Sequence, residues 1–161
     1  MNQWCKKYQP ELMGSFICLF FGMLSGYIAH AGDTSWYQSL IKPTFNPPSW
    51  IFSPVWTILY LMIGTAGVKL WKLRKTYPTN FNLFFIQIIL NYAWSSVFYY
   101  FKNIKFALII LAAMWCINCI LLLQLKKQKN IALIKLFIPY FAWISFALIL
   151  NFQIAQLNPH L

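Results

Sequence analysis

The sequence predicts an all-α membrane protein: a bundle of five transmembrane helices with a partly helical first loop. Of its 161 residues, 60% are hydrophobic and only 9% are charged, whereas a soluble domain carries about 25% charged residues. The charged residues are separated by five uncharged stretches of at least 20 residues, which is the length a helix needs to cross a ~30 Å hydrocarbon core. Helices are favoured because a lipid-exposed backbone must satisfy its own hydrogen bonds.

The five uncharged stretches set the predicted spans and leave no room for a soluble appendage. We therefore expect residues 1–161 to form a single transmembrane domain. The 15 Phe, 9 Tyr and 8 Trp residues exclude a disordered chain, because they require burial. The basic residues lie between apolar runs and not in one patch, which argues against nucleic acid as a partner. The predicted spans are residues 11–30, 49–71, 81–101, 106–125 and 133–155.

The first span has a competing interpretation. Two lysines, an apolar run and then Ala29-His30-Ala31 imitate a secretory signal peptide with its cleavage site. The uncharged run is 21 residues long, however, and the apolar part of a signal peptide usually has 7–15. Gly22 and Gly26 also suggest a helix-packing face. We expect a retained span.

The first loop, residues 33–48, is aromatic-rich and stiff. Asp33 or Thr34 can cap a short helix that runs through Ile41. Three prolines then force an extended exit into the second span: Pro43, Pro47 and Pro48. Such a loop fits a structured cover over the mouth of the bundle. It fits equally an interfacial belt, since Trp and Tyr favour the depth of the headgroups.

Polar, small and aromatic residues recur at helical spacing in three spans. In the second span they are Trp56, Tyr60, Gly64, Gly67 and Trp71. In the third they are Gln87, Asn91, Trp94 and Phe98. In the fifth they are Tyr140, Trp143, Ala147, Leu150 and Asn151. Amides are costly against lipid, so they should point into the bundle. Either they only join the helices by hydrogen bonds, or indoles beside small residues line a cavity for a flat apolar ligand.

The fourth span carries Cys116 and Cys119 in a CxxC arrangement. No second pair of ligands lies nearby in sequence, and a zinc site normally needs four nitrogen or sulfur ligands. We therefore interpret the two cysteines as small apolar residues of the span. No metal site is predicted.

The lysines and arginines indicate an orientation. Ten of them fall on the side of the N-terminus and of the second and fourth loops, and three fall on the side of the first loop: Lys42, Lys102 and Lys105. By the positive-inside rule the N-terminus is cytoplasmic and the first loop faces outward, if the membrane is that of a bacterial cell.

The aromatic motifs resemble those of the translocator protein family, also called TspO/MBR, tryptophan-rich sensory protein or peripheral-type benzodiazepine receptor. In the first loop and second span the similar residues are Trp36-Tyr37, Leu40-x-Lys42-Pro43-x-x-x-Pro47-Pro48, Trp50, Pro54-Val55-Trp56 and Leu59-Tyr60. Later ones are Gln87-x-x-x-Asn91-x-x-Trp94, Pro139-Tyr140-x-x-Trp143 and Asn151. The resemblance covers four of the five spans in order.

The resemblance implies a five-helix bundle, often a homodimer, whose ligand pocket opens toward the first loop. Family ligands are protoporphyrin and other tetrapyrroles, synthetic benzodiazepine-site compounds and, in some members, sterols. No cofactor is required; porphyrin enters as a ligand. The stripes and the resemblance together give these candidate ligand-binding residues: Trp36, Lys42, Pro43, Pro47, Pro48, Trp50, Tyr60, Gln87, Asn91, Trp94, Trp143, Ala147, Leu150 and Asn151.

The sequence also departs from the family in two places. Ser95-Ser96 stands where mitochondrial relatives often have proline after the tryptophan, so this helix should bend differently. Phe152 and Gln156 replace the Tyr and Arg of the sterol-recognition segment of animal members, which makes sterol a doubtful partner.

The chemistry available to an enzyme is limited. General acid–base catalysis needs a tuned His, Asp or Glu in the pocket, but Glu11 lies at a helix start, Asp33 and His30 lie near the first loop, and His160 is next to the C-terminus. We therefore expect a membrane receptor or carrier for tetrapyrroles and similar flat ligands.

Two alternatives to this function remain. The first is light-dependent degradation of protoporphyrin through paired indoles, for which the resemblance indicates Trp56 and Trp143. The second is a regulatory membrane protein that its ligand stabilises.

Overall fold

The computed structural model describes residues 3–30 and 34–160, and the part of the chain it describes is helical without a strand. Five helices are long and apolar enough to cross a membrane, so the predicted fold class of a five-span all-α membrane protein is confirmed. The elements are α1 (Gln3–His30), α2 (Thr34–Ser39), η1 (Ser49–Ile51), α3 (Phe52–Lys72), α4 (Pro78–Ser95), η2 (Ser96–Tyr100), α5 (Ile104–Lys127) and α6 (Ile131–Leu157).

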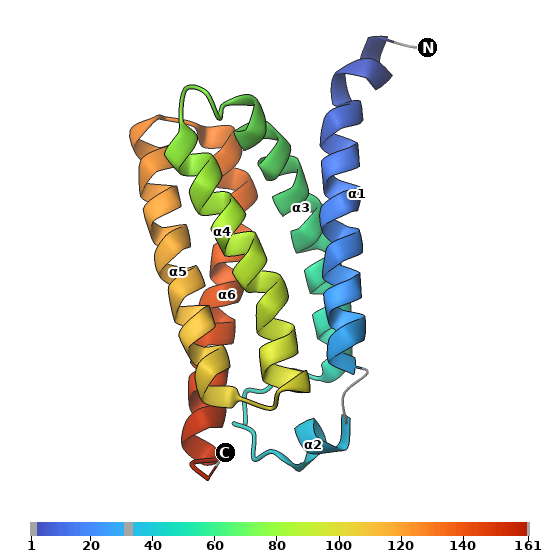
Figure 1. Cartoon of the computed structure of the whole chain (residues 1–161), viewed down its shortest axis with the longest axis vertical. Helices are drawn as coiled ribbons and strands as arrows, with labels where there is room; N and C mark the ends of the chain where they lie inside the picture. Colours follow the sequence, from blue (N-terminus) through green and yellow to red (C-terminus); the bar gives the residue numbers. More distant parts are fainter. Residues whose placement is uncertain (1–2, 31–33, 161) are drawn as a thin grey trace.

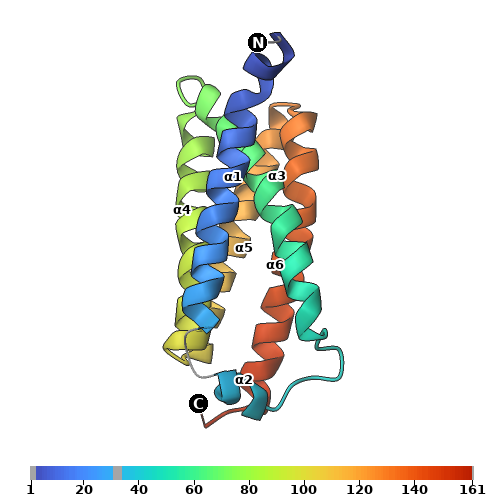
Figure 2. The same ribbon diagram turned by 90° about the vertical axis from the view of Figure 1, so that its right-hand side faces the viewer.

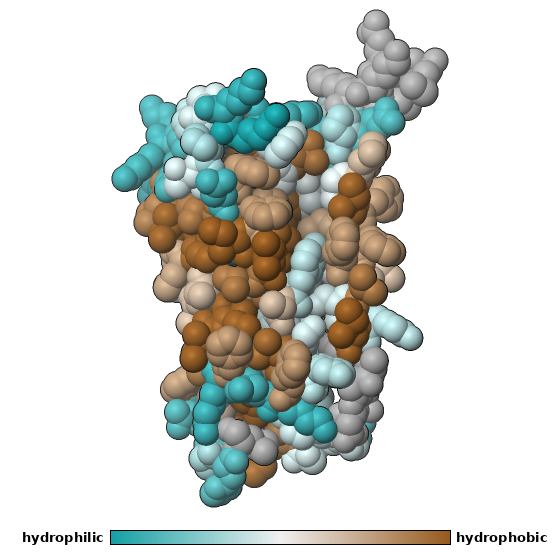
Figure 3. All heavy atoms as spheres, viewed as in Figure 1, coloured by the Kyte–Doolittle hydropathy of each residue, from teal (hydrophilic) through white to brown (hydrophobic). Residues whose placement is uncertain are grey.

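The five long helices run side by side along the long axis of the molecule (Figures 1 and 2). The N-terminus lies at one end, and the first loop with α2 lies at the other end, near the C-terminus. Hydrophobic residues form a broad band across the middle of the molecule, and hydrophilic residues gather at both ends (Figure 3). This is the distribution expected of a bundle that crosses a bilayer.

The helices extend beyond the uncharged stretches from which the spans were predicted. The fourth and fifth spans begin at Ile104 and Ile131, two residues before the predicted 106 and 133, and each ends two residues later than predicted. Lys126 and Lys127 fall inside the last turn of α5, where their charges interact favourably with the last carbonyl groups. The first turns of α5 and α6 are capped by Asn103 and Asn130, whose side chains accept hydrogen bonds from backbone N–H groups.

Two buried clusters fill the bundle. The larger lies among α3, α4, α5 and α6 and includes the fully buried Ile63, Phe137 and Ile144. The smaller lies at the loop end, where Leu40 of the first loop, only 5% exposed, packs with Phe98, Ile104 and other residues of the bundle. The first loop is therefore anchored on the bundle by a buried side chain, which favours the structured cover over the interfacial belt.

The end of α4 changes its hydrogen-bonding pattern. Residues 96–100 form a π-helical turn, in which the N–H of Phe101 donates to the carbonyl of Ser96 at 3.0 Å. A π-turn inserts one extra residue into the helix and alters the direction of the following side chains. Phe98 lies within this turn and is 1% exposed. This turn follows the Ser95-Ser96 pair at which the sequence predicted a different bend.

The two glycines of the predicted packing face in α1 differ. A Cβ on Gly22 would collide with the ring of Tyr60, so α1 needs a glycine there to approach α3. Around Gly26 no atom of another described segment lies within 4 Å of such a Cβ. Only Gly22 therefore supports packing within the chain.

Candidate ligand-binding site

A small cavity of about 30 Å³ lies at the loop end of the bundle, lined by residues of α3, α4, η2 and α6, with α2 contributing one residue. This volume is that of about one water molecule and is well below that of small-molecule sites, so a larger ligand has to expand the cavity. The lining is mostly aromatic and contains one amide. Its residues are Tyr37, Phe52, Trp56, Trp94, Phe98, Tyr99, Trp143, Phe146, Ala147, Leu150, Asn151 and Ile154.

Three indoles from three helices meet at this cavity. Trp56 and Trp143 are perpendicular, with ring centroids 6.3 Å apart. Trp94 stacks on Phe98 at 5.4 Å, and Phe52 meets Trp143 edge-on at 5.8 Å. These are the offset and edge-to-face arrangements that aromatic quadrupoles favour. The rings therefore contact one another in this structure, and a planar guest would have to separate some of them.

The amide of Asn151 orients one of these indoles. Its Oδ1 accepts a hydrogen bond from Trp94 Nε1 at 3.2 Å, and its Nδ2 donates to the carbonyl of Ile104 at 3.2 Å. The side chain is 2% exposed. Asn151 thus holds Trp94 against α6 and ties α5 to the same point, which fixes one wall of the cavity.

Deeper in the bundle lies a network of hydrogen bonds whose residues do not line the cavity. Tyr60 donates to Asn91 Oδ1 at 2.8 Å, and Asn91 Nδ2 donates to the Tyr140 hydroxyl at 3.1 Å. Tyr140 donates to Gln87 Oε1 at 2.7 Å, and Asn118 Nδ2 approaches the same oxygen at 3.4 Å. The predicted site residues Tyr60, Gln87 and Asn91 therefore join helices here and do not line the cavity.

Trp56 separates the cavity from the network. Its ring lines the cavity, stacks on Tyr60 at 5.2 Å and meets Tyr140 edge-on at 6.5 Å. A change in the position of Trp56 would therefore alter both regions. Asn118 was not predicted as a site residue, although the rule applied to Gln87 and Asn91, that intramembrane amides point inward, also identifies it.

The first loop covers the cavity through its aromatic residues. Trp36 packs edge-on against Phe98 at 5.8 Å, and Tyr37 lines the cavity and donates to Asn46 Oδ1 at 3.3 Å. Burial raises the pKa of the Tyr37 phenol, an effect partly opposed by the hydrogen bond with Asn46. The phenol therefore remains neutral and a hydrogen-bond donor throughout the physiological range.

Two side chains, of Lys42 and Asn158, hold the first loop in this position. Lys42 Nζ donates to the carbonyls of Gln38 and Leu40, both at 3.1 Å, and lies 4.7 Å from the centre of the Tyr37 ring. At the end of α6, Asn158 pairs with the backbone of Ile41: Oδ1 accepts from its N–H at 3.0 Å and Nδ2 donates to its carbonyl at 2.9 Å. The cover is thus closed by these hydrogen bonds together with the buried side chain of Leu40.

Several predicted site residues lie outside the cavity lining. Pro43, Pro47 and Pro48 shape the loop, and Trp50 is 72% exposed at the start of the second span. Four aromatic residues that line the cavity were not predicted from the sequence: Tyr37, Phe52, Tyr99 and Phe146. Phe146 follows Trp143 by one helical turn, and Tyr37 directly follows Trp36, so each had a signal in its spacing.

The other chemically reactive groups do not form a site. The side chains of Asp33 and His30 lie outside the described residues, and Cys116 is exposed. Within residues whose placement is described, no three His, Cys, Asp or Glu side chains lie close enough to hold a metal ion. The cavity is therefore suited to binding through shape and aromatic contact.

Comparison with known proteins agrees with the architecture. A sequence model of the TspO/MBR family matches residues 15–157. The tryptophan-rich protein TspO of Chlorobaculum tepidum is 36% identical over 147 residues, covering 89% of this chain and 92% of that protein. TspO of Archaeoglobus fulgidus is 31% identical, covering 92% and 97%. The translocator protein of Bos taurus is 30% identical, covering 85% and 83%.

Proposed function

The chain belongs to the TspO/MBR family of multi-pass membrane proteins, and on this premise we propose that it is a receptor or carrier for a tetrapyrrole such as protoporphyrin, or for another flat lipophilic ligand. The observation that supports the proposal best is the convergence of three indoles from α3, α4 and α6 on one cavity closed by Tyr37. Rings from separate helices can contact both faces of a planar guest.

The chemistry of a porphyrin fits the lining of this cavity, which has to expand to hold the ring. Its ring needs aromatic faces, and each stacked pair contributes roughly 0.5–1.5 kcal/mol beyond the burial of its area. Its propionates need donors near water. Lys42 lies in the cover, where its ammonium now bonds two backbone carbonyls and can exchange them for a carboxylate.

Entry of the guest requires rearrangement at the loop end only. The contacts to be replaced are ring-to-ring contacts such as Trp94–Phe98 and Trp56–Trp143. A flat aromatic ligand can offer the same stacked and edge-to-face contacts to these rings. The hydrogen bonds of Asn158 to Ile41 would open to admit it. The deeper network keeps its partners, so the bundle stays assembled.

The test is a titration of the purified protein with protoporphyrin, followed by quenching of tryptophan emission. Trp94→Ala and Trp143→Ala should each weaken binding. A matched control is Trp115→Ala, because Trp115 is also partly buried but contacts Phe141 and bonds Ser145 away from the cavity. Unchanged affinity in both cavity variants would refute the assignment.

The contact between Trp56 and Trp143 supports a second candidate, light-dependent degradation of the bound porphyrin. Excited porphyrin can take an electron from an adjacent indole, and dioxygen is then the oxidant that opens the ring. The test is the loss of porphyrin absorbance under light with oxygen present. Trp56→Phe or Trp143→Phe should slow this loss relative to Trp115→Phe. Equal rates in all variants would indicate photobleaching without participation of the protein.

We also propose a homodimer whose stability the ligand regulates. Around Gly26 there is open space on α1, which allows a second helix to approach. Cross-linking with and without protoporphyrin tests this. A Gly26→Leu substitution should reduce the yield of cross-linked dimer. A yield that changes neither with this substitution nor with protoporphyrin would contradict the proposed dimer.

For orientation we propose that the N-terminus is cytoplasmic and that the first loop faces outward in a bacterial cell membrane. The lysine and arginine asymmetry between the two ends of the bundle supports this. The cavity would then open to the outer side. Labelling of a cysteine introduced at the exposed Thr44, in intact cells and with an impermeant reagent, tests it.

A further inference from the structure

A second hollow lies on the opposite half of the bundle from the cavity. It is a groove of about 440 Å³ between α1 and α4, with α3 as its floor. Figure 1 shows α3 between these two helices. Gly64 and Gly67 form part of its floor, and a Cβ on Gly67 would lie 2.6 Å from the ring of Phe84. Larger residues at these positions would fill the groove.

The groove is apolar and faces the lipid. Phe85 and Ile89 of α4 line it and are each about half exposed, as is Trp71 at the end of α3. In a membrane such a surface is covered by an acyl chain or by another helix, because water is absent at this depth.

The length of the groove matches one leaflet. On α4 it extends from Phe81 to Tyr92, which at 1.5 Å per residue is about 16 Å. Half of a hydrocarbon core is about 15 Å. The groove begins at the lysine-rich end of the bundle, so it reaches from the level of the headgroups toward the middle of the membrane. A single acyl chain has this length and position.

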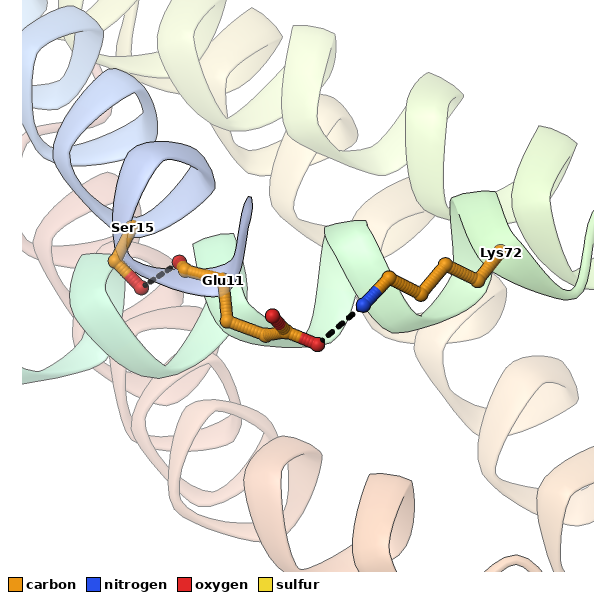
Figure 4. Close-up of polar contacts among 3 residues, drawn as sticks. All are labelled: Glu11, Ser15 and Lys72. Carbon is orange, nitrogen blue, oxygen red and sulfur yellow. Dashed lines mark hydrogen bonds and ion pairs between the residues drawn. The ribbon is translucent and has the colours of Figure 1, made fainter. Parts of the chain in front are cut away.

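A cation stands at the headgroup end of the groove. The guanidinium of Arg74 lies over the ring of Trp71 at 3.7 Å from the ring centre, and one of its nitrogens donates to the carbonyl of Trp71 at 2.7 Å. A guanidinium has five N–H donors, so the others can bind a phosphate. The ammonium of Lys72 is in contrast paired with Glu11 at 2.7 Å (Figure 4).

We propose that this groove binds an anionic phospholipid, with an acyl chain along α4 and the phosphate on Arg74. Charge complementarity favours a lipid, and not a second copy of the chain, as the occupant of the groove. The neighbouring cations Lys69 and Lys75 add positive charge at the same end, and Glu11 is the single acidic side chain within the described residues. Two copies facing each other here would bring these positive ends together.

The experiment reconstitutes the full chain in bilayers of equal parts phosphatidylglycerol and phosphatidylcholine with identical acyl chains. The protein is extracted in mild detergent, and the retained lipids are counted by native mass spectrometry. We expect one retained lipid per chain, with phosphatidylglycerol preferred. Arg74→Gln should lower this preference about fivefold, since one basic residue contributes about 1 kcal/mol to binding an anionic lipid.

Matched variants separate the parts of the site. Ile89→Trp should fill the groove and abolish retention of either lipid, whereas Ile86→Trp, on an equally exposed face of α4 outside the groove, should have no effect. Lys127→Gln, an exposed charge at the same end of the bundle, is the control for Arg74→Gln.

Three results would overturn the proposal. They are equal retention of the two lipids by the unmodified chain, equal effects of Arg74→Gln and Lys127→Gln, and a change in oligomeric state with Ile89→Trp that leaves lipid retention intact. The last result would assign the groove to a second copy. None of these results depends on the aromatic cavity, whose titration with protoporphyrin is separate.

Discussion

The residues along one side of the third span, α4 and η2, lie in two different surroundings. Gln87 and Asn91 lie in a buried hydrogen-bond network, whereas Trp94 and Phe98, one and two turns further along, face a cavity. Helical spacing places all four on the same side of the helix. What lies opposite decides their role: hydroxyl groups of Tyr60 and Tyr140 in one half, and indole rings in the other.

This difference separates a fixed region from an adjustable one. Hydrogen bonds in the middle of a membrane are directional, and a buried donor without a partner costs roughly 1–3 kcal/mol. Contacts between aromatic rings tolerate displacement, and another flat surface can replace them. The network therefore holds the helices in place while the cavity can change its shape around a ligand. Four substitutions test this division.

The largest effect is expected from Asn91→Leu. It leaves the Tyr60 hydroxyl without its acceptor and removes the donor to Tyr140, which keeps its own bond to Gln87. The free energy of unfolding should therefore fall by about 1–3 kcal/mol. Protoporphyrin affinity of the folded protein should stay within about twofold. Unfolding in mixed micelles and a fluorescence titration measure the two quantities. A large loss of affinity without loss of stability would contradict the division.

A smaller effect is expected from Asn158→Ala, which removes both hydrogen bonds that hold the loop at Ile41. The closed cover should lose about 1 kcal/mol, so protoporphyrin should dissociate about fivefold faster. Stopped-flow displacement measures this rate. Asn130→Ala provides a comparison, because it removes the cap at the start of α6, at the opposite end of the bundle. A faster rate in that variant as well would argue against a specific role of the Asn158 hydrogen bonds.

Trp94→Phe should have a weaker effect still. It keeps an aromatic ring at the cavity and removes only the hydrogen bond from Nε1 to Asn151. Protoporphyrin affinity should fall by about 1 kcal/mol or less, well short of the loss in Trp94→Ala. Equal losses in the two variants would mean that the indole nitrogen, and not the aromatic face, makes the important contact.

The smallest effect at neutral pH is expected from Tyr37→Phe, which keeps the ring and removes the bond to Asn46. Because the pKa of Tyr37 is raised, its contribution to the closed cover is complete below the ordinary tyrosine pKa and is lost as pH rises through the raised value. The ratio of the dissociation rates of Tyr37→Phe and wild type should therefore be small and constant up to about pH 9. At higher pH only the wild type should become faster, and a pH series measures this.

The sequence was sufficient for the spans and for one face of each helix. Gaps between charges located five helices to within a few residues of their ends, apart from the first, which extends to Gln3. Spacing alone put Trp143, Ala147 and Leu150 on one stripe, and the structure places all three in the cavity lining.

Depth and partners were not accessible from spacing. Gly64, Gly67 and Trp71 share a stripe with Trp56, yet they line the groove on the outer side of the bundle, because α1 and α4 pack against α3 at these glycines. Lys42 was predicted to bind a ligand, but its ammonium donates hydrogen bonds to backbone carbonyls of its own loop. Both facts depend on contacts between segments far apart in the sequence, or on the path of a loop, which periodicity does not encode.

The structure of the protein with protoporphyrin bound measures the central claim most directly. The account predicts a planar ring at the loop end, in contact with Trp94 and Trp143, with propionates toward Lys42 and with the hydrogen bonds among Tyr60, Asn91 and Tyr140 unchanged. A porphyrin seated on the lipid-facing surface, with the indoles still packed against one another, would contradict it.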